Sequence, residues 1–423
     1  MKKSLFEKIQ IDNTTSSVPI LLMTATFNSE YQSLLESMIG FKLLAPNTFW
    51  ARQSSFEKRH IHINIKYSTQ HFRLMKEYLI THLASNSTHK AIIVTNTALR
   101  ASQCKNELNN WLDTHNKLHG DCVLVVGDRD PELKFAYTTA FTNNTFDSTI
   151  PNTSNALQPR FLIGTSGCIG AGLDCSDVHL VMRLGLSTNI TNFIQEMGQC
   201  GRIPNDSPLS SYSDHFNIVF SIQDFLYIHK RIHVEDKSET TTTDINELSI
   251  SREYIKSLEL RNYMKLCSML FLNFGCWHHY LEMSSSSPTQ DPYSAQNYNP
   301  CNSYCPYCTN TISNIVKMVD RQQLSLFLVE SMTNTTKVYT PIQLGDELYK
   351  YNNCGKLIYR RKHSQKPNAK SDCYMTIVQL ILAYILRLKY DEENMNKSYC
   401  ILPHNNAIFN YSNDYHWHYI KHW

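Results

Sequence analysis

Short apolar runs alternate with longer mixed stretches through the first half of the chain. Four of these runs are rich in Val, Ile and Leu and have the length of strands. The predicted strands are Ala91–Asn96, Cys122–Val126, Phe161–Ile163 and Val178–Arg183. A helix is predicted after the first strand, with an apolar face made of Leu99, Cys104, Leu108 and Trp111. Alternating strands and helices predict an α/β fold with a parallel, doubly wound sheet.

The pattern near the carboxyl end predicts two helices and then a hairpin. Thr340–Leu348 has the residues of a capped helix start. Met375–Leu388 is strongly apolar and predicts a second helix. Tyr390–Ile401 suits a β-hairpin that turns at residues 394–396. This region is therefore expected to have an α+β fold, separate from the parallel sheet.

The composition fits a folded protein of several domains. The chain has 423 residues, 42% of them hydrophobic, which suits about two to four domains. No apolar run is long enough to span a bilayer, and Met1–Lys3 leads into polar residues and not into a signal-peptide core. Both observations favour an intracellular protein that does not contact membranes. The net charge of +3 is too small to predict a nucleic-acid partner by itself.

Residues 161–202 combine polar loops with two of the predicted strands. A loop of Thr, Ser and Gly follows the strand at Phe161–Ile163 and ends at Asp174. The strand at Val178–Arg183 leads into a helix that ends near Arg202. Because parallel strands end at a common edge, such loops lie where nucleotides and phosphates bind. An arginine at that edge can stabilise charge on a transferring phosphoryl group.

The sequence of this segment, GTSGCIGAGLD followed by QEMGQCGR, resembles motifs V and VI of superfamily 2 helicases, in the form found in RecQ-like DNA helicases. The resemblance implies that Arg202 is the arginine finger and that Gln195 contacts the nucleotide or couples two lobes. Gln199 stands where the family has a further arginine, so one charged contact to the phosphates is expected to be lost. The implied nucleotide-binding residues are Gly172, Asp174, Gly198 and Gly201, and the implied DNA-binding residues are Asn96, Thr165 and Ser166.

Upstream segments resemble other parts of the same helicases. Pro19–Phe27 resembles motif III, which implies that Thr24 and Thr26 couple two lobes. Ser54–Arg59 resembles the entry to the second lobe, and the first predicted strand resembles motif IV. The sequence contains no G-x-x-x-x-G-K-S/T loop. Asp391–Glu393 is far from any apolar strand that leads into a nucleotide-binding loop, so it does not match the Asp-Glu pair that holds magnesium in these helicases. We therefore expect a chain that begins just before motif III and lacks the first lobe. ATP and Mg²⁺ would then bind only where a first lobe, such as a separate polypeptide, is supplied.

Three closely spaced cysteines predict a zinc site. The chain has 13 cysteines, too sparse over its length for a disulfide scaffold. Cys301, Cys305 and Cys308 can supply adjacent corners of a Zn²⁺ tetrahedron. The cluster resembles the zinc subdomain of RecQ helicases, which implies Cys267, at the start of a preceding helix, as the fourth ligand. The alternatives for that ligand are Cys276, His278 and His279.

The region after residue 312 resembles the winged-helix domain of RecQ helicases, since two helices and a hairpin are predicted in that order. Between the two helices lies a run of basic side chains without an acidic residue. Such a run suits contacts with DNA phosphates, and a solvated loop is the alternative. The candidate DNA-binding residues of this run are Arg360, Arg361 and Lys362.

Together these resemblances imply a carboxyl-terminal portion of a RecQ-like DNA helicase. The family's activity is ATP-dependent unwinding of DNA in the 3′ to 5′ direction, in recombination, repair and replication, and its location is nuclear. The expected domains are a first-lobe remnant (1–30), a RecA-like lobe (31–225), a helical zinc-binding subdomain (226–312) and an α+β winged helix (313–423). A second hypothesis is a non-catalytic DNA-binding protein that retains only the binding modules.

Overall fold

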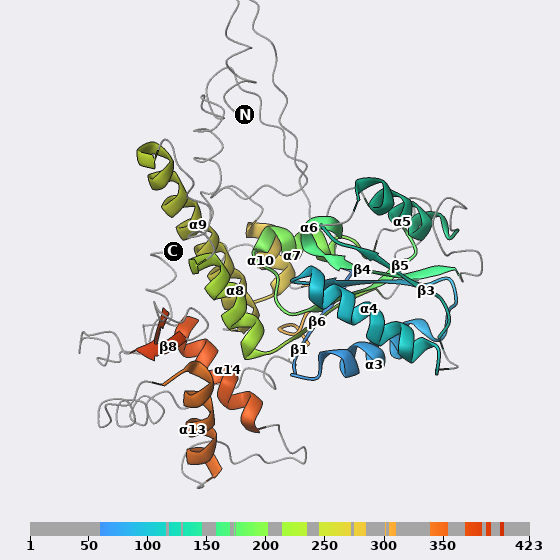
Figure 1. The fold of residues 1–423 in the computed structure, drawn as a ribbon. Helices are drawn as coiled ribbons and strands as arrows, with labels where there is room; N and C mark the ends of the chain where they lie inside the picture. The colour runs from blue at the N-terminus through green and yellow to red at the C-terminus, as the bar shows by residue number, and fades with distance from the viewer. Residues whose placement is uncertain are drawn as a thin grey trace, which may run out of the picture.

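The computed structural model describes a lobe built around one sheet, and the helices and hairpin that follow it (Figure 1). The described residues are 60–115, 118–127, 130–145, 158–169, 173, 175–201, 214–234, 245–271, 275–284, 301, 304–309, 339–353, 369–382, 386–390 and 398–401. Among the helices within these ranges, none has the length and apolar character needed to cross a membrane.

Six strands form the sheet in the order β1-β6-β5-β2-β4-β3, and every neighbouring pair is parallel. Their bounds are β1 His62–Tyr67, β2 Lys90–Thr95, β3 Asp121–Val125, β4 Pro159–Thr165, β5 Val178–Leu184 and β6 His215–Phe220. The four strands predicted from apolar runs are confirmed as β2 to β5. Strands β1 and β6 were not predicted. Strand β1 alternates Ile with His, Asn and Lys and so has no continuous apolar run.

Helices cover both faces of this sheet, as the alternation of elements predicts. Helices α3 and α4 pack on one face, and α5, α6 and α7 pack on the other (Figure 1). Their bounds are α3 His71–Leu83, α4 Ala98–Leu112, α5 Pro131–Asn143, α6 Ser166–Ile169 and α7 Ile190–Met197. The expected α/β lobe with a parallel sheet is therefore confirmed.

One position on the predicted apolar face of α4 is wrong. Cys104 and Leu108 are buried against the sheet as expected, and Ala101 lies with them. Leu99 is instead 70% exposed. The helix starts directly after its N-cap residue Thr97, and this start places Leu99 in the first turn, away from the sheet.

The helices that follow the sheet share its core. They are α8 Ile222–Val234, α9 Ile245–Phe271 and α10 Trp277–Ser284. Phe220 of β6 stacks on Phe271 at the end of α9, with ring centroids 4.8 Å apart. The hydroxyl of Tyr263 in α9 donates to the carbonyl oxygen of Phe225 in α8 at 3.0 Å. One hydrophobic core therefore runs from the sheet into these helices.

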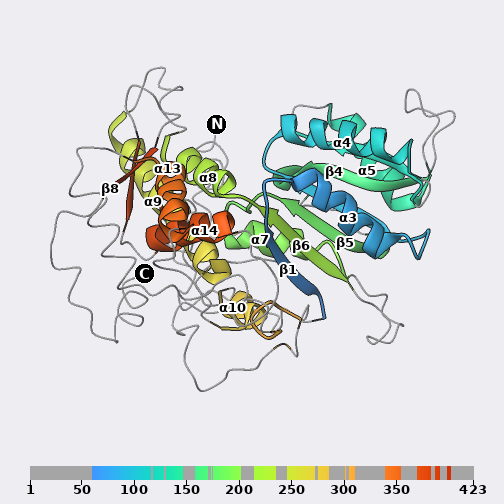
Figure 2. The ribbon, with the colours of Figure 1, turned by 90° about the horizontal axis from the view of Figure 1, so that it is seen from below.

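The first of the two predicted carboxyl-terminal helices is confirmed as α13, Pro341–Asn353. The backbone N–H of Thr340 donates to Gln343 Oε1 at 3.0 Å, and the N–H of Gln343 donates to Thr340 Oγ1 at 3.2 Å. This reciprocal pair is a capping box. Figure 2 shows α13 and α14 beside α8 and α9, to one side of the sheet.

The second helix, α14, spans Ala369–Leu382 and ends before the predicted Leu388. The N–H of Leu386 donates to the carbonyl oxygen of Leu380 at 3.1 Å. The chain then forms an antiparallel hairpin of β7, Arg387–Tyr390, and β8, Ser398–Ile401. A hairpin is present as predicted and β8 lies within the predicted range, but β7 ends at Tyr390, where the hairpin was predicted to begin. Its turn lies outside the described residues.

Candidate functional site

The carboxyl ends of β2 and β4 bring three predicted binding residues together. The two strands are neighbours, with Thr95 of β2 in register with Thr165 of β4. Asn96 and Ser166 directly follow these strand ends. Asn96, Thr165 and Ser166 therefore lie along one edge of the sheet, which we call the carboxyl edge, as a parallel arrangement requires.

A buried ion pair holds the loops at the carboxyl edge. The guanidinium of Arg183 in β5 donates to Glu196 Oε1 in α7 at 2.9 Å and to Ser166 Oγ at 2.7 Å. It also donates to the side-chain oxygen of Asn96. The second carboxylate oxygen of Glu196 accepts from Ser187 Oγ at 2.6 Å. The side chains of Arg183 and Glu196 are only 0% and 2% exposed, so water is excluded from the pair.

Burial sets the chemistry of this ion pair. It lowers the pKa of the Arg183 guanidinium, while the neighbouring Glu196 carboxylate raises it. A buried pair needs its remaining donors and acceptors bonded, and the side chains of Asn96 and Ser166 meet part of that need. Neither Arg183 nor Glu196 is among the predicted site residues, although an arginine inside an apolar strand signals a buried partner.

A second polar group joins the starts of three helices near the same edge. Asp224 in the first turn of α8 accepts from Arg100 Nη1 of α4 at 2.8 Å. The His71 ring at the start of α3 lies 3.4 Å from the same carboxylate. Gly185, with φ of +107°, passes so close to Asn96 that a Cβ would meet the amide nitrogen at 2.7 Å. Apart from Asn96, these residues were not predicted, because their contacts join segments far apart in the sequence.

The chain after α7 leaves the carboxyl edge. Gly201 has φ of +66°, and its carbonyl oxygen lies 3.2 Å from His60 Nε2. A Cβ at Gly201 would also meet Asp214 Oδ2 at 3.3 Å. Because His60 and Asp214 precede β1 and β6, Gly201 lies at the amino ends of these strands. The expectation that residues 161–202 gather at one edge does not hold for Gly201, since α7 carries the chain back along the sheet.

Apart from the cysteines, three further predicted site residues lie in the part of the chain that the structure describes, and the others lie outside it. Gln195 is half-buried in α7, and Gln199 is buried, with its N–H donating to the Glu196 carbonyl oxygen at 3.1 Å. Gly198 is the C-cap residue of α7. The predicted residues outside the described part of the chain are Thr24, Thr26, Gly172, Asp174, Arg202, Arg360, Arg361 and Lys362.

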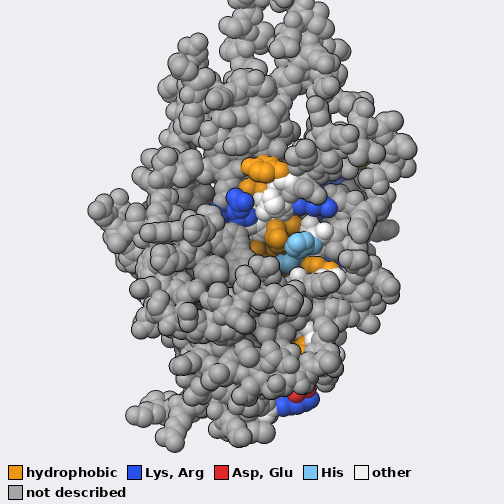
Figure 3. All heavy atoms as spheres, turned by 90° about the vertical axis from the view of Figure 1, so that its left-hand side faces the viewer, with side chains coloured by type: hydrophobic (Ala, Val, Ile, Leu, Met, Phe, Trp, Pro, Cys, Tyr) orange, Lys and Arg blue, Asp and Glu red, His pale blue; other side chains and the backbone are white. Residues whose placement is uncertain are grey.

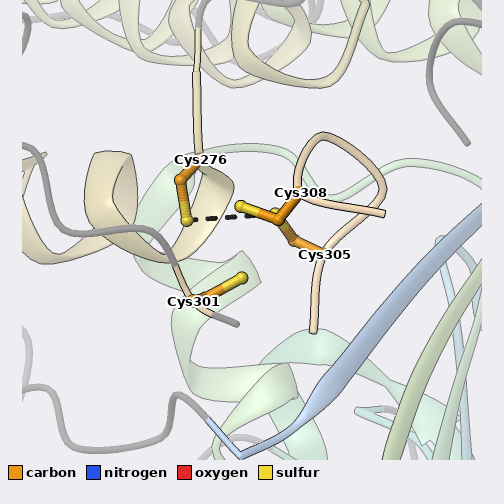
Figure 4. A group of neighbouring side chains, drawn as sticks. All are labelled: Cys276, Cys301, Cys305 and Cys308. Carbon is orange, nitrogen blue, oxygen red and sulfur yellow. Dashed lines mark hydrogen bonds between the residues drawn. The ribbon is translucent and has the colours of Figure 1, made fainter. Parts of the chain in front are cut away.

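Four cysteine thiols converge beside the sheet (Figure 4). Cys276, just before α10, meets Cys301, Cys305 and Cys308, and all four sulfur atoms lie within 4.8 Å of one another. Cys267, the predicted fourth member, is not part of this group. It is buried in α9, and its thiol is hydrogen-bonded to Tyr263. The structure thus selects Cys276 from the predicted alternatives.

The spacing of the thiols fits a tetrahedral zinc ion. Cys276 Sγ and Cys305 Sγ lie 3.9 Å apart, whereas sulfur atoms in a disulfide are about 2.05 Å apart. Because Zn–S bonds measure about 2.3 Å, the edge of a tetrathiolate tetrahedron is about 3.8 Å. The donor set, four thiols without a competing carboxylate, is also that of a structural zinc site. The residues present therefore fit Zn²⁺.

The protein environment prepares the thiols for metal binding. Hydrogen bonds with Cys301 and Cys305 lower the pKa of Cys276, and the backbone N–H of His279 adds to this effect. The hydrogen bond with Cys276 raises the pKa of Cys305 to about 12, while the backbone N–H of Cys308 opposes the shift. Cys276 therefore loses its proton more readily than Cys305, and thiolate is the form that binds metal.

The cysteine cluster is docked on the edge strand β1. The N–H of Ile63 donates to the carbonyl oxygen of Tyr304 at 2.8 Å. The Tyr304 ring lies against His62, with ring centroids 4.5 Å apart. The segment that carries Cys301 and Cys305 thus covers part of the free edge of the sheet, which would otherwise expose unpaired backbone groups.

Figure 3 shows the face where α8 and α9 lie, on the left of Figure 1. Lys and Arg side chains on this face lie on either side of hydrophobic and His side chains. Helices α8 and α9 carry Tyr227 and Tyr254, which are 42% and 45% exposed, and α9 also carries the exposed Arg261.

Residues 71–204 match the family model described as the helicase conserved C-terminal domain. Similar solved structures include the E. coli DEAD-box protein SrmB, bound to the regulator of ribonuclease activity A, with 13% identity and a TM-score of 0.28. The match covers 39% of this chain and 81% of the SrmB chain. S. cerevisiae Dbp5, bound to RNA and ADP BeF3, has 15% identity and a TM-score of 0.33, with 56% of this chain and 54% of that chain covered. This chain thus spans about half of the Dbp5 chain, and likenesses this weak carry no argument on function. No curated protein matches the chain.

The family match covers most of the sheet lobe, from α3 to the end of α7. That stretch holds the strand ends at Thr95 and Thr165 and the buried pair of Arg183 and Glu196. Residues 71–204 are therefore a helicase C-terminal domain, with a RecA-like fold.

Proposed function

We propose that the chain acts as the second-lobe portion of a RecQ-like DNA helicase, which unwinds DNA in the 3′ to 5′ direction with energy from ATP. The observation that carries this proposal is the helicase C-terminal domain at residues 71–204. At its carboxyl edge, Arg183 fixes the side chains of Asn96 and Ser166. Polar side chains that are held in place in this way suit contacts with a nucleic-acid backbone.

The cysteine cluster supports the RecQ-like form of the proposal. A cluster of three cysteines after the second lobe is the feature that resembles RecQ helicases, and it lies with a fourth thiol against β1. In the proposal Cys276, Cys301, Cys305 and Cys308 hold one Zn²⁺ ion, which cross-links the segments around the edge strand. DNA as the substrate and a nuclear location both follow from this resemblance.

ATP hydrolysis in this proposal requires a first lobe. The sequence contains no Gly-rich loop with a Lys for the phosphates. The first lobe would bind ATP and Mg²⁺, while Arg202 of this chain would stabilise charge on the transferred phosphoryl group. Asn96, Thr165 and Ser166 would contact the DNA strand as the two lobes open and close.

A non-catalytic DNA-binding role is the second candidate, and Gln199 favours it. This residue stands in place of an arginine of motif VI, and its side chain is buried and uncharged. A glutamine cannot stabilise phosphate charge as a guanidinium does. In this candidate the chain binds DNA through its carboxyl-terminal helices and hairpin, without hydrolysis.

ATP hydrolysis by the full chain, measured with single-stranded DNA, separates the two candidates. The assay is run on the chain alone and on the chain mixed with the first lobe of a RecQ-like helicase. The helicase proposal predicts DNA-stimulated hydrolysis in the mixture, above that of the first lobe alone. An Arg202→Ala chain is the matched control and should return the mixture to the background rate. DNA binding without any stimulated hydrolysis would favour the non-catalytic role.

A further inference from the structure

Helix α8 lies between the sheet and the hairpin of β7 and β8 (Figure 2). It spans 13 residues, from Ile222 to Val234. Asp224 lies in its first turn, and His229 and His233 lie in its later turns. Because an α-helix rises about 1.5 Å per residue, Asp224 and His233 are about 14 Å apart along the axis. One helix therefore contacts both the carboxyl edge of the sheet and the hairpin.

The first turn of α8 is bound into the carboxyl edge. One carboxylate oxygen of Asp224 accepts from the N–H and the hydroxyl of Ser221 at 2.7 and 2.8 Å, and the other accepts from Arg100 Nη1 at 2.8 Å. A Cβ at Gly185 would lie 2.7 Å from Asn96 Nδ2 and 3.2 Å from Asp224 Oδ1. Because Asn96 and Asp224 both lie against Gly185, a ligand that shifts Asn96 also acts on the start of α8.

The later turns of α8 hold the hairpin. Nδ1 of His229 lies 2.6 Å from the hydroxyl oxygen of Tyr390, the last residue of β7. The ring of His233 also lies against Tyr390, with ring centroids 5.6 Å apart. His229 is buried, and a hydrogen bond shielded from water is stronger than one at the surface. The position of β7 therefore depends on the position of α8.

Helix α8 is suited to transmit a displacement. Its sequence, IQDFLYIHKRIHV, contains neither Gly nor Pro, which are residues at which helices bend. Phe225, Ile228 and His229 are all buried, so one face of the helix is packed along its length. A displacement of the first turn is therefore passed on to the later turns and is not absorbed by a kink.

We propose that α8 couples the carboxyl edge to the hairpin, so that a nucleic-acid strand bound beside Asn96 makes the hairpin less mobile. The inference rests on the proposed function, which places the strand at that edge, and it adds a link between the edge and the hairpin. A strand that restrains Asn96 also restrains Asp224, and through α8 it restrains Tyr390. Ordering of one site that reduces the motion of another couples the two sites.

The first test is hydrogen exchange of the full chain, measured by mass spectrometry with and without a saturating thymidine oligonucleotide. We expect the oligonucleotide to slow exchange in peptides that cover β7 by about fivefold or more. His229→Phe removes the nitrogen that meets the hydroxyl of Tyr390, so the oligonucleotide should no longer slow exchange there. An equal effect in this variant would show that the strand restrains the hairpin without α8, and would overturn the inference.

Tyr227→Phe is the matched control for this test. Tyr227 lies on the same helix with its side chain 42% exposed, so the control should behave like the parent chain. A strand that binds the parent chain without slowing exchange in β7 would also overturn the inference.

The second test needs no ligand. Arg100→Gln removes the cation bonded to Asp224, so exchange in β7 should become faster by about fivefold or more. The same change in a His229→Phe background should have no further effect on β7. Arg73→Gln is the control, because this side chain is 68% exposed and pairs with Glu77 of its own helix. Unchanged exchange in β7 of Arg100→Gln, with β2 and β4 still protected, would contradict the coupling.

The outcomes also separate this inference from the proposed function. A chain that does not bind the oligonucleotide defeats the proposed function, and Arg100→Gln then decides the coupling by itself. A chain that binds the oligonucleotide, with no change in β7 in either test, defeats only the coupling.

Discussion

Arg183 and Glu196 are the residues on which the order of the carboxyl edge depends. They form a buried ion pair, and Arg183 also donates hydrogen bonds to Ser166 and Asn96. An arginine that is buried and charged is stable only while its carboxylate partner stays ionised and in place. The loops that bear the candidate nucleic-acid contacts therefore stay in place only while this ion pair is intact.

Glu196→Gln should lower the free energy of unfolding by about 3–5 kcal/mol, because it leaves the buried charge of Arg183 without a counter-charge. Urea denaturation of the full chain measures the effect. The matched control is Glu77→Gln, which removes an ion pair with Arg73 whose side chains are 55% and 68% exposed. This control should cost less than about 1 kcal/mol. Equal effects of the two changes would show that the buried pair contributes no more to the free energy of unfolding than the exposed pair.

Cys276→Ala should abolish binding of the one zinc ion proposed per chain, while Cys267→Ala should leave the metal content unchanged. The reason is that only Cys276 lies with the three clustered cysteines, whereas Cys267 is buried in α9 beside Tyr263. Metal analysis of the purified full chain gives the answer. Loss of zinc in the Cys267 variant, with retention in the Cys276 variant, would contradict the observed cluster.

The zinc site is visible in the sequence, whereas the identity of its fourth ligand is not. Three clustered cysteines predict a metal site from spacing alone, and Asn96 and Ser166 follow from their places after apolar strands. The choice between Cys267 and Cys276 depends on the direction in which each side chain points. Cys267 follows Tyr263 by one helical turn and so faces the same core, and this phase is set by packing that the sequence pattern does not reveal.

At the scale of elements, the sheet edge and the cysteine cluster support one another. The carbonyl oxygen of Tyr304 accepts from the N–H of Ile63, at one end of β1. At the other end of the strand, the N–H of Ser68 donates to the carbonyl oxygen of Phe220 of β6 at 2.8 Å. Only the first of these bonds depends on the segment that the metal would hold.

Removing the metal with a chelator should speed hydrogen exchange at the Ile63 amide more than at the Ser68 amide. The segment of Tyr304 loses its cross-link and opens locally, while the pairing of β1 with β6 persists. Exchange measured by mass spectrometry or NMR on the full chain tests this. No change at Ile63, or an equal rise at both amides, would mean that the cluster does not stabilise the edge of β1.

Histidines on β1, β6 and α3 form a contact group that makes stability depend on pH. The His215 ring lies 4.0 Å from His82 and 5.0 Å from His62, between centroids. Burial, together with these two neighbours, lowers the pKa of His215 from 6.5 to about 3. The unfolded chain therefore binds the proton first as the pH falls. The stabilisation is full above pH 6.5 and is lost between pH 6.5 and about 3.

His215→Gln should accordingly reduce the loss of stability between pH 7 and pH 5, since glutamine does not titrate in that range. The measurement is the urea midpoint of the parent chain and the variant at both pH values. A variant that loses as much stability on acidification as the parent would show that His215 does not contribute to the pH dependence.

The elements themselves were predictable where a run of apolar residues marks them. Strands β2 to β5 and the capped start of α13 fall into this group. Strands β1 and β6 were missed. Strand β1 is an edge strand with one face of polar side chains, and in β6 His215 and Asn217 interrupt the apolar residues. Helix α14 ends earlier than its apolar run, because residues 387–390 pair with β8 instead of continuing the helix.

At the scale of the whole molecule, the sheet lobe and the later helices are joined by one core. Phe220 and Phe271 stack across the junction, and Tyr263 bonds the backbone of α8. Such contacts join residues about 40–50 positions apart, and their partners are not visible in local sequence patterns. The parallel sheet could be predicted because short apolar runs mark four of its strands. The shared core could be found only in the folded chain.

We propose that this helicase C-terminal domain serves a DNA-directed, RecQ-like helicase. The most direct measurement is equilibrium binding of the zinc-loaded full chain to a labelled forked DNA, compared with a forked RNA of matching sequence, over a range of salt concentrations. The DNA fork should bind more tightly, and its binding should weaken as salt rises because phosphate contacts release counterions. Equal or tighter binding to the RNA fork, or no binding to either, would contradict it.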